Sequence, residues 1–569
     1  MSQSSNVRPN LLLLQLAGLL AVALPYVVNL DKSALWDGNE TFYAETPREM
    51  LETGNLLAPQ FNYEPRPQKP PLTYWAVLLG YQVVGIRELG VRLPGAFAVV
   101  GTLLFTFGMG RMLYSPRAGL LALVILGTTL RVFILARKLP IDLLLLFWLT
   151  GTAYFLMRAA QKDSRRDWLL AYLFAGLGFL TKGPVAWALP GLSYIVWSLW
   201  MRRFKFRRVY PLAGIGILAV VTLPWYLMTY LSHRWIYIAD FFLQDNFARF
   251  ATEIRGPVRG PFYYFPVLFG DFFPWSILLI AVAAALWFER KALRSHDSLS
   301  YGFPLVWCGV TFLLFSISKN KQEYYIAPLY PVMAALLGGV MDRGLLPGTA
   351  LYDRLRSYWR GLFLVIALLF LAIAALLPFL LPALIPDGTI VLHYVPSALL
   401  LSAAAALIWE VRRCRLERCV ISIVISLWLV FILSGAVYLP ALEPLRPVKE
   451  ICRAIEAQVQ SGDEIGYYRA AVPSMLFYLR RPIFSVSDPD TMVRKFEGAN
   501  RVFCVLSEQD FDYFTGKRAL GLHVINRYRQ LPTQLGTMLG KKRPTGEDLL
   551  LVSNRSPNVH SNTDRGKNP

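Results

Sequence analysis

Apolar runs of about twenty residues recur along most of this chain, and this feature limits its fold more than any other. A helix of that length crosses the hydrocarbon core of a bilayer, and 55% of the 569 residues are hydrophobic. Lipid offers no water to the backbone N–H and C=O groups, so each run must be a helix that satisfies its own backbone. The sequence therefore predicts an all-α polytopic membrane protein.

Lysine and arginine gather in short segments between the apolar runs, such as RRFKFRR (202–208) and RRCRLER (412–418). They outnumber Asp and Glu by 58 to 37, which gives a formal net charge of +21. Loops rich in lysine and arginine stay on the cytoplasmic side of a membrane. Topology therefore explains much of the excess, and no nucleic-acid partner is predicted.

With those clusters inside, the pattern predicts a cytoplasmic N-terminus, no cleavable signal peptide and an outer C-terminus. The run 72–86 is interpreted as an interfacial helix of the first outer loop, 31–88. The thirteen predicted spans are 11–30, 89–110, 118–137, 141–160, 167–181, 184–201, 211–231, 272–289, 301–318, 325–342, 361–384, 391–410 and 419–439.

The character of the sequence changes after Pro440. Short strands are predicted at 462–468, 501–507 and 548–554, separated by helical patterns. We expect a small outer α/β domain over 441–555, followed by a disordered tail, 556–569, rich in Asn, Ser, Lys and Gly. The five cysteines have no metal-ligand spacing, and a disulfide between Cys452 and Cys504 remains open.

The first outer loop contains several acids. The motif TPRE predicts a helix with Thr46 as N-cap, Pro47 at its first position and Glu49 reaching back, which ends at Gly54. Asp37 and Glu40 would precede that helix in a Gly-Asn turn. An acid in such a turn could act as a general base, and a structural role is the alternative.

Lys69 lies in RPQKPPLTYW (66–75), between two hydrophobic runs. The two prolines that follow it stiffen the backbone and present the ammonium at the depth of a lipid phosphate. The alternative is a lysine that anchors the next helix at the interface. Asp142, after Pro140, is either an acid favoured by a helix dipole or a functional group near the membrane.

The segment SISKNKQEYYIAPLYP (316–331) brings Lys319, Lys321 and Tyr325 together. Ammonium and phenol groups suit phosphate oxygens. Lys182 in TKGP and Arg249 in DNFARF add cations to the same outer face. This face is therefore a candidate site for a phosphorylated lipid.

Five motifs in this order resemble those of the bacterial lipid-A aminoarabinose transferases and their relatives, the protein O-mannosyltransferases. They are ETFYAETPREMLETGN with QKPPLTYW, ARKLPIDLLLLF, GLGFLTKGPVAWALP, DNFARF with YYFPVLFGDFFPWS, and SKNKQEYYIAPLYP. The resemblance spans residues 10–345. It implies the GT-C fold over 1–440, with about 13 transmembrane helices and interfacial helices in the first outer loop.

The resemblance also implies a function. Proteins of this kind move a sugar, with inversion, from a polyprenyl (undecaprenyl) phosphate carrier to an acceptor on the outer face of the bacterial inner membrane. The acceptor is a lipid A-like glycolipid, another envelope glycan or a protein. A transporter or flippase of lipid-linked sugars is the alternative. The ionisable residues favour the transferase, because they gather at the outer ends of spans rather than at the bilayer midplane.

The resemblance assigns roles to single residues. Lys69 matches the lysine of the KPP motif, which binds the donor phosphate, and Arg249 and Tyr325 match its partners. Lys321 joins them by its chemistry, and Asp142 matches the acid of the second outer loop.

This chain departs from the family pattern in the first outer loop. The family usually has Asp-Glu followed two residues later by Arg, whereas this chain has Asn39-Glu40 followed by Phe42. Asp37 or Glu40 would supply the missing acid, and with Asp142 they are the predicted catalytic residues. Gln68 replaces the family's Glu before the lysine. No metal ligand is therefore predicted, although a divalent ion stays open as a cofactor.

Overall fold

The computed structural model describes residues 18–66, 68–138, 140–202, 206–251, 259–290, 298–385, 388–530 and 548–556. Part of the predicted first span, nearly all of the predicted tail and the side chain of Arg249 lie outside these described residues.

From Asn39 to Ala441 the described residues form helices joined by loops, with one two-stranded hairpin of β1 (Gln60–Phe61) and β2 (Glu64–Pro65). The α-helices are α2 (Asn39–Thr53), α3 (Leu72–Val84), α4 (Glu88–Leu113), α5 (Pro116–Gly127), α6 (Leu130–Lys138), α7 (Pro140–Lys162), α8 (Arg165–Lys182), α9 (Val185–Trp200), α10 (Pro211–Ala239), α11 (Arg249–Ala251), α12 (Tyr264–Asp271), α13 (Trp275–Phe288), α14 (Ser298–Ile317), α15 (Leu329–Gly344), α16 (Ala350–Leu384), α17 (Ile390–Arg412), α18 (Leu416–Leu433) and α19 (Leu439–Ala441).

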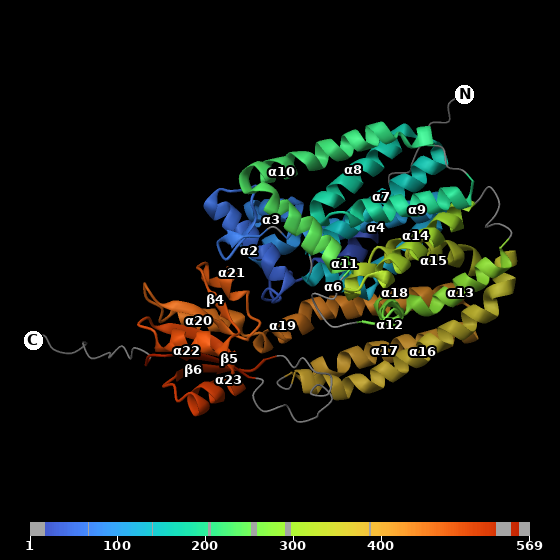
Figure 1. Ribbon diagram of the computed structural model, residues 1–569. Helices are drawn as coiled ribbons and strands as arrows, with labels where there is room; N and C mark the ends of the chain where they lie inside the picture. The colour runs from blue at the N-terminus through green and yellow to red at the C-terminus, as the bar shows by residue number, and fades with distance from the viewer. Residues whose placement is uncertain are drawn as a thin grey trace, which may run out of the picture.

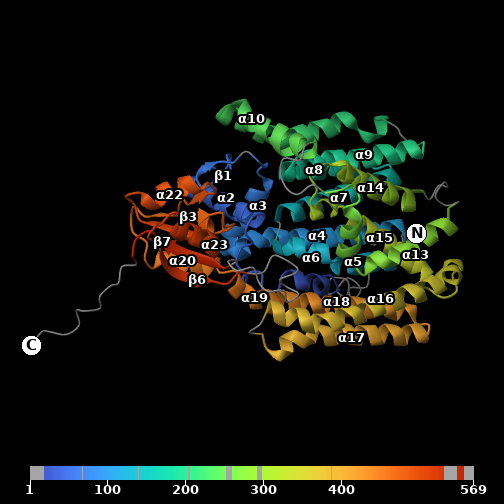
Figure 2. The same cartoon turned by 60° about the horizontal axis from the view of Figure 1, so that its bottom comes forward.

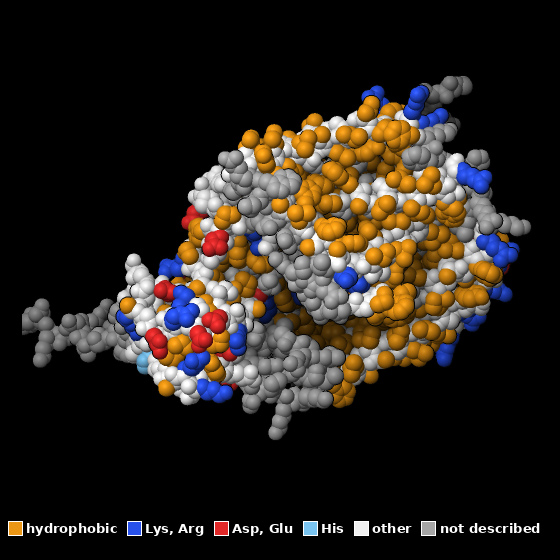
Figure 3. All heavy atoms as spheres, viewed as in Figure 1, with side chains coloured by type: hydrophobic (Ala, Val, Ile, Leu, Met, Phe, Trp, Pro, Cys, Tyr) orange, Lys and Arg blue, Asp and Glu red, His pale blue; other side chains and the backbone are white. Residues whose placement is uncertain are grey.

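Among the described residues, seven helices are long and apolar enough to cross a membrane, or up to nine if each of two bent pairs is one span. Figure 3 shows a broad hydrophobic surface over this helical part, with Lys and Arg side chains at the end away from the C-terminal segment. Such a surface is stable only in contact with lipid or protein. The chain is therefore a multi-pass membrane protein, while the count of thirteen spans stays a prediction.

One of the predicted spans is not a single straight helix, because the run 118–137 is α5 followed by α6 at an angle of 55°. The run 272–289 contains the single helix α13, and α12, which comes just before that run, meets α13 at 106°. Pro274 stands at the second bend and cannot donate a backbone hydrogen bond there. A hydropathy pattern records apolar length but not direction, so these bends had no signal in it.

The helix of the first outer loop begins earlier than predicted. It starts at Asn39, so Thr46 and Pro47 lie inside α2 and Thr46 is not its N-cap. The predicted end is correct, since Gly54 closes the helix with φ of 68°. Glu49 does not cap the helix either: its carboxylate accepts hydrogen bonds from the backbone N–H groups of Asn62 (2.7 Å) and Tyr63 (2.9 Å).

The buried carboxyl of Glu49 predicts a pH dependence of stability. Burial, with the neighbouring Glu45 carboxylate, raises the pKa of Glu49 from 4.5 to about 7. A carboxyl with a raised pKa binds its proton more tightly in the folded state, so its contribution to stability is greatest below about pH 4.5 and is lost as the pH rises toward about 7. We expect the melting temperature to fall across this window and Glu49→Gln to flatten the fall. A profile that the substitution leaves unchanged would assign the dependence to another group.

The residues after α19, here called the C-terminal segment, contain a five-stranded sheet in the order β4-β3-β5-β7-β6. The strands at β4, β3 and β5 are parallel, and β7 is antiparallel to β5 and β6. The elements are α20 (Val448–Glu456), β3 (Glu464–Tyr468), α21 (Met475–Leu479), β4 (Phe484–Val486), α22 (Pro489–Glu497), β5 (Val502–Ser507), α23 (Glu508–Asp512), β6 (His523–Tyr528) and β7 (Leu549–Ser553).

Side chains alternate across this sheet. On β5, Phe503 and Val505 face the cluster that contains α20, whereas Cys504 and Leu506 face the cluster that contains α22. Cys452 of α20 and Cys504 therefore belong to different layers, and both are free thiols. The three predicted strands are present, and β4 and β6 were not predicted.

Figures 1 and 2 show this sheet and its helices at one end of the helical part, beside α2 and α3. The helices α16 and α17 pack against each other along one edge. The first outer loop therefore lies between the membrane helices and the C-terminal segment.

Candidate functional site

A cavity of about 480 Å³ lies between α7, α9 and α14. Its lining is mostly apolar and includes a few polar side chains. The described lining residues are Lys69, Asp142, Leu145, Leu146, Leu149, Lys182, Pro184, Val185, Ala188, Phe242, Phe247, Phe250, Leu314, Phe315, Ser318, Tyr324, Tyr325, Ala327 and Pro328. The first outer loop and the segments predicted from TKGP, DNFARF and SKNKQEYY thus meet at one place.

Asp142 and Lys182 form an ion pair in the wall of the cavity. Asp142 stands in the first turn of α7, and Lys182 is the last residue of α8. Gly183 follows with φ of 104°, a conformation that favours glycine, and Pro184 then starts the next helix. The TKGP motif therefore turns the chain sharply and leaves the ammonium at the cavity.

Lys69 reaches the cavity from the segment before α3. It is only 8% exposed, and its ammonium donates a hydrogen bond to the carbonyl of Gln68 at 2.9 Å. A lysine that merely anchored a helix at the interface would keep its ammonium in water. The burial of Lys69 in the wall of a mostly apolar cavity instead suits a bound anion.

The loop between α14 and α15 supplies the other polar wall. Lys182 Nζ lies 5.2 Å from the ring centroids of both Tyr324 and Tyr325. Lys321 is 6% exposed and donates a hydrogen bond to the carbonyl of Ser318 at 2.5 Å. Burial lowers the pKa of Lys321 from its ordinary value. Lys321 is not among the described residues that line the cavity, but Ser318, whose carbonyl it binds, is one of them.

Aromatic and aliphatic side chains line the rest of the cavity. Phe242, Phe247 and Phe250 come from the segment around α11, and Phe315 comes from α14. The sequence analysis assigned none of these four side chains a role, although Phe247 and Phe250 belong to the DNFARF motif. Together they give the cavity a lining that suits an apolar chain.

The structure separates the three predicted catalytic acids. Asp142 is the one carboxylate among the described residues that line the cavity. Glu40 is buried at 1% exposure and forms a bidentate ion pair with Arg92, at 2.7 and 3.0 Å. Asp37 has an exposed face, and its Oδ1 accepts two hydrogen bonds from Ser474 of the C-terminal segment, one from the backbone N–H at 3.0 Å and one from the hydroxyl.

Sequence reasoning missed the residues that hold the first outer loop, chiefly Arg92, Arg446 and Ser474. It also treated Asn39 only as a lost acid, whereas Asn39 Nδ2 lies 3.5 Å from the Tyr324 hydroxyl at the cavity. These contacts join residues far apart in the sequence, from 52 positions for Arg92 and Glu40 to 437 for Ser474 and Asp37, so no local pattern could indicate them.

A metal site does not fit the residues present. No group of three or more His, Cys, Asp or Glu side chains within the described ranges is arranged to hold a metal ion. The position before Lys69 is Gln68, which cannot supply a negative ligand.

The solved structure of ArnT from Cupriavidus metallidurans bound to undecaprenyl phosphate is similar to this chain, with a TM-score of 0.75 and 20% identity. The superposition covers 97% of this chain and 99% of that one. This chain has the ArnT fold. The same protein in its apo state superposes with a TM-score of 0.72 at 21% identity, over 96% of this chain and 98% of that one.

Sequence comparison agrees with the ArnT fold. The family described as Dolichyl-phosphate-mannose-protein mannosyltransferase matches residues 68–227. The undecaprenyl phosphate-alpha-4-amino-4-deoxy-L-arabinose arabinosyl transferases of Erwinia tasmaniensis and Pseudomonas aeruginosa are each 32% identical to this chain, over 56% and 63% of it. The matches cover 57% and 64% of those relatives, which is less than two thirds of their length. The resemblance predicted from the motifs is therefore confirmed.

Proposed function

We propose that this protein is an inverting glycosyltransferase that moves a sugar from a polyprenyl (undecaprenyl) phosphate carrier to an acceptor on the outer face of the bacterial inner membrane. The observation that carries the proposal is one cavity whose lining combines apolar and aromatic side chains with the buried ammonium of Lys69 and the ammonium of Lys182. A polyprenyl phosphate has the same two parts. The names of the ArnT-fold relatives support this reading.

In the proposed reaction, the bond between the anomeric carbon and the donor phosphate oxygen breaks as an acceptor oxygen attacks from the opposite face. The phosphate leaves with the charge, so cations that meet this charge lower the barrier. We assign this role to Lys69 and Tyr325, which line the cavity. Lys321, which lies outside the described lining, and Arg249 are further candidates. Lys182 lies on the same wall.

We propose that Asp142 is the catalytic acid closest to the reacting atoms. The ammonium of Lys182 already binds its carboxylate, so orienting the acceptor is the role that fits it. An acceptor phosphate would need no proton removed, and a hydroxyl acceptor would. The acceptor classes remain a lipid A-like glycolipid, another envelope glycan or a protein.

A transfer assay tests the function. Purified protein in detergent would be given undecaprenyl-phosphate sugars and extracted envelope lipids, and the products would be followed by mass spectrometry. We expect transfer of the sugar and release of undecaprenyl phosphate. Envelope glycans and lipids that are unchanged in cells lacking the protein, together with no transfer in vitro, would contradict the proposal.

We also propose an orientation, with the N-terminus in the cytoplasm and a separate outer domain over 441–555. The lysine and arginine clusters between spans support it. Cys414, which is exposed between α17 and α18, would then face the cytoplasm.

The orientation predicts a labelling pattern. In spheroplasts, a membrane-impermeant maleimide should leave Cys414 unmodified until the membrane is permeabilised. In a Cys414→Ser background, Glu497→Cys on the exposed face of the C-terminal segment should label at once. Immediate labelling of Cys414 from outside would show that the orientation is the reverse of the one proposed.

A further inference from the structure

Four consecutive residues of the first outer loop, 34–37, are held by the C-terminal segment. Glu443 accepts a hydrogen bond from the backbone N–H of Ala34 at 2.9 Å, and the Tyr478 hydroxyl accepts one from Leu35 at 2.9 Å. Arg446 donates to the carbonyls of Ala34 and Leu35, at 2.9 and 2.6 Å. The Arg446 guanidinium also lies over the ring of Trp36, and Asp37 is held through its carboxylate. The bonded backbone groups of Ala34 and Leu35 leave this part of the loop little freedom to move.

Apolar contacts reinforce these bonds. Ala34 is fully buried in the core formed by α20 and one face of the sheet. Leu35, also fully buried, packs in a cluster that contains Phe477 of the C-terminal segment and Tyr81 of α3. Ala34 and Leu35 of the loop thus pack inside hydrophobic clusters that contain side chains of the C-terminal segment.

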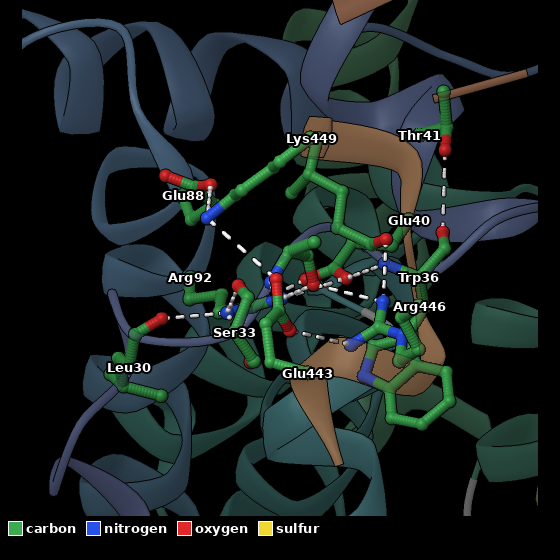
Figure 4. A network of polar contacts seen from close by, with 12 residues as sticks. Leu30, Ser33, Trp36, Glu40, Thr41, Glu88, Arg92, Glu443, Arg446 and Lys449 are labelled. Atoms are coloured by element: carbon green, nitrogen blue, oxygen red, sulfur yellow. Dashed lines mark hydrogen bonds and ion pairs between the residues drawn. The ribbon is translucent and has the colours of Figure 1, made fainter. Parts of the chain in front are cut away.

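A network of charges anchors the other side of the loop (Figure 4). Arg92 of α4 binds Glu40 and donates to the carbonyls of Leu30 (2.6 Å) and Ser33 (3.0 Å). Lys449 of α20 pairs with Glu88 at the start of α4, at 2.7 Å. Membrane helix, loop and C-terminal segment therefore form one connected polar structure.

The held segment ends beside the cavity. Asp37 is bound by Ser474, Gly38 turns the chain with φ of 95°, and Asn39 begins α2 next to the Tyr324 hydroxyl. Asn39 therefore lies between two held residues, Asp37 on Ser474 and Glu40 on Arg92.

We propose that the C-terminal segment contributes to the transferase site. Ser474 is a positioning residue: it holds Asp37 and thereby places Asn39 beside Tyr324 at the cavity. The inference rests on the proposed function. It gives Asp37 a role as an anchor rather than as a base, because its carboxylate is bonded to Ser474 and does not line the cavity.

The two roles of Asp37 predict different mutants. An amide oxygen at Asp37→Asn can accept the same two bonds from Ser474, so an anchor survives this change and a general base does not. Asp37→Ala removes the acceptor in either case. Ser474→Ala leaves only the backbone N–H bond, whereas Ser474→Thr keeps the hydroxyl.

The experiment measures turnover, undecaprenyl phosphate binding and melting temperature for these four variants and for Ser485→Ala, an exposed serine of β4. We expect Ser474→Ala and Asp37→Ala to lose about 10- to 100-fold in turnover. Asp37→Asn and Ser474→Thr should stay within roughly three-fold of the wild type, Ser485→Ala should match it, and undecaprenyl phosphate binding should be unchanged throughout. If Ser474→Ala does not fold, the Asp37→Asn and Asp37→Ala pair decides alone.

The pH profile separates the anchor from a base. The pKa of Asp37 is raised overall, chiefly by burial and slightly by the Glu40 carboxylate. The hydrogen bonds from Ser474 and the nearby Arg446 charge act in the opposite direction and lower this pKa. If Asp37 were the base, Ser474→Ala would move the acid limb of the profile to higher pH. For an anchor, we expect the rate to fall by the same factor at every pH.

The outcomes also separate this inference from the proposed function. A wild type that neither binds undecaprenyl phosphate nor transfers sugar would overturn the function itself. An active wild type with Asp37→Asn at background, or with Ser474→Ala at full rate, would overturn only the anchor.

Discussion

Lys69→Ala is expected to reduce kcat/KM for sugar transfer by roughly 30- to 1000-fold, equivalent to about 2–4 kcal/mol of transition-state stabilisation. The ammonium is buried in the wall of a largely apolar cavity, where little water screens its charge. The donor phosphate gains negative charge as the sugar leaves, so the loss should appear in kcat as well as in donor affinity. Steady-state kinetics with a lipid-phosphate-linked sugar would measure both.

Two further variants make the Lys69 result specific. Lys69→Arg keeps the charge but changes the geometry, and we expect it to recover part of the activity. Lys32→Ala removes an exposed lysine of the same outer loop and should behave as the wild type. Near-normal turnover of a well-folded Lys69→Ala protein would return this lysine to the role of an interfacial anchor.

Glu40→Ala should lower the free energy of unfolding by about 3–5 kcal/mol, the usual cost of leaving one member of a buried ion pair without its partner. Glu40 and Arg92 are 1% and 2% exposed, and Glu40 Oε2 also accepts a hydrogen bond from the backbone N–H of Trp36 at 2.7 Å. Thermal melting of the detergent-solubilised protein, followed by tryptophan fluorescence, would measure the loss.

Glu52→Ala is the matched control for Glu40→Ala. Both residues lie on α2 and both pair with an arginine, but the side chain of Glu52 is 49% exposed. A surface ion pair contributes about 0–1 kcal/mol, so this variant should melt close to the wild type. Equal melting temperatures for the two variants would show that the Arg92 pair adds little to stability.

Some residues of the cavity could be identified from the sequence and others could not. Lys69, Asp142, Lys182 and Tyr325 were found from the sequence, because each lies in a motif whose prolines, glycines or helix ends limit the local backbone. A local pattern of this kind predicts both the residue and the direction in which the chain presents it.

The start of α2 was predicted wrongly for a related reason. Thr46 and Pro47 make a good helix start when considered alone. In the structure the helix begins at Asn39, where Glu40 binds Arg92. Tertiary contacts can offset the backbone hydrogen bond that Pro47 cannot donate, and the local rule contains no term for them.

The sequence by itself determined the membrane class, three of the five strands of the C-terminal sheet and the motifs that meet at the cavity, because these follow from apolar length, alternation and local backbone limits. Only the tertiary structure decided which acid lies where. Asp37 and Glu40 stand three positions apart, yet one is bound by Ser474 and the other by Arg92. Their roles depend on partners brought together by folding, and the strength of an ionic or hydrogen-bonded contact depends on distance and burial, which a linear pattern does not contain.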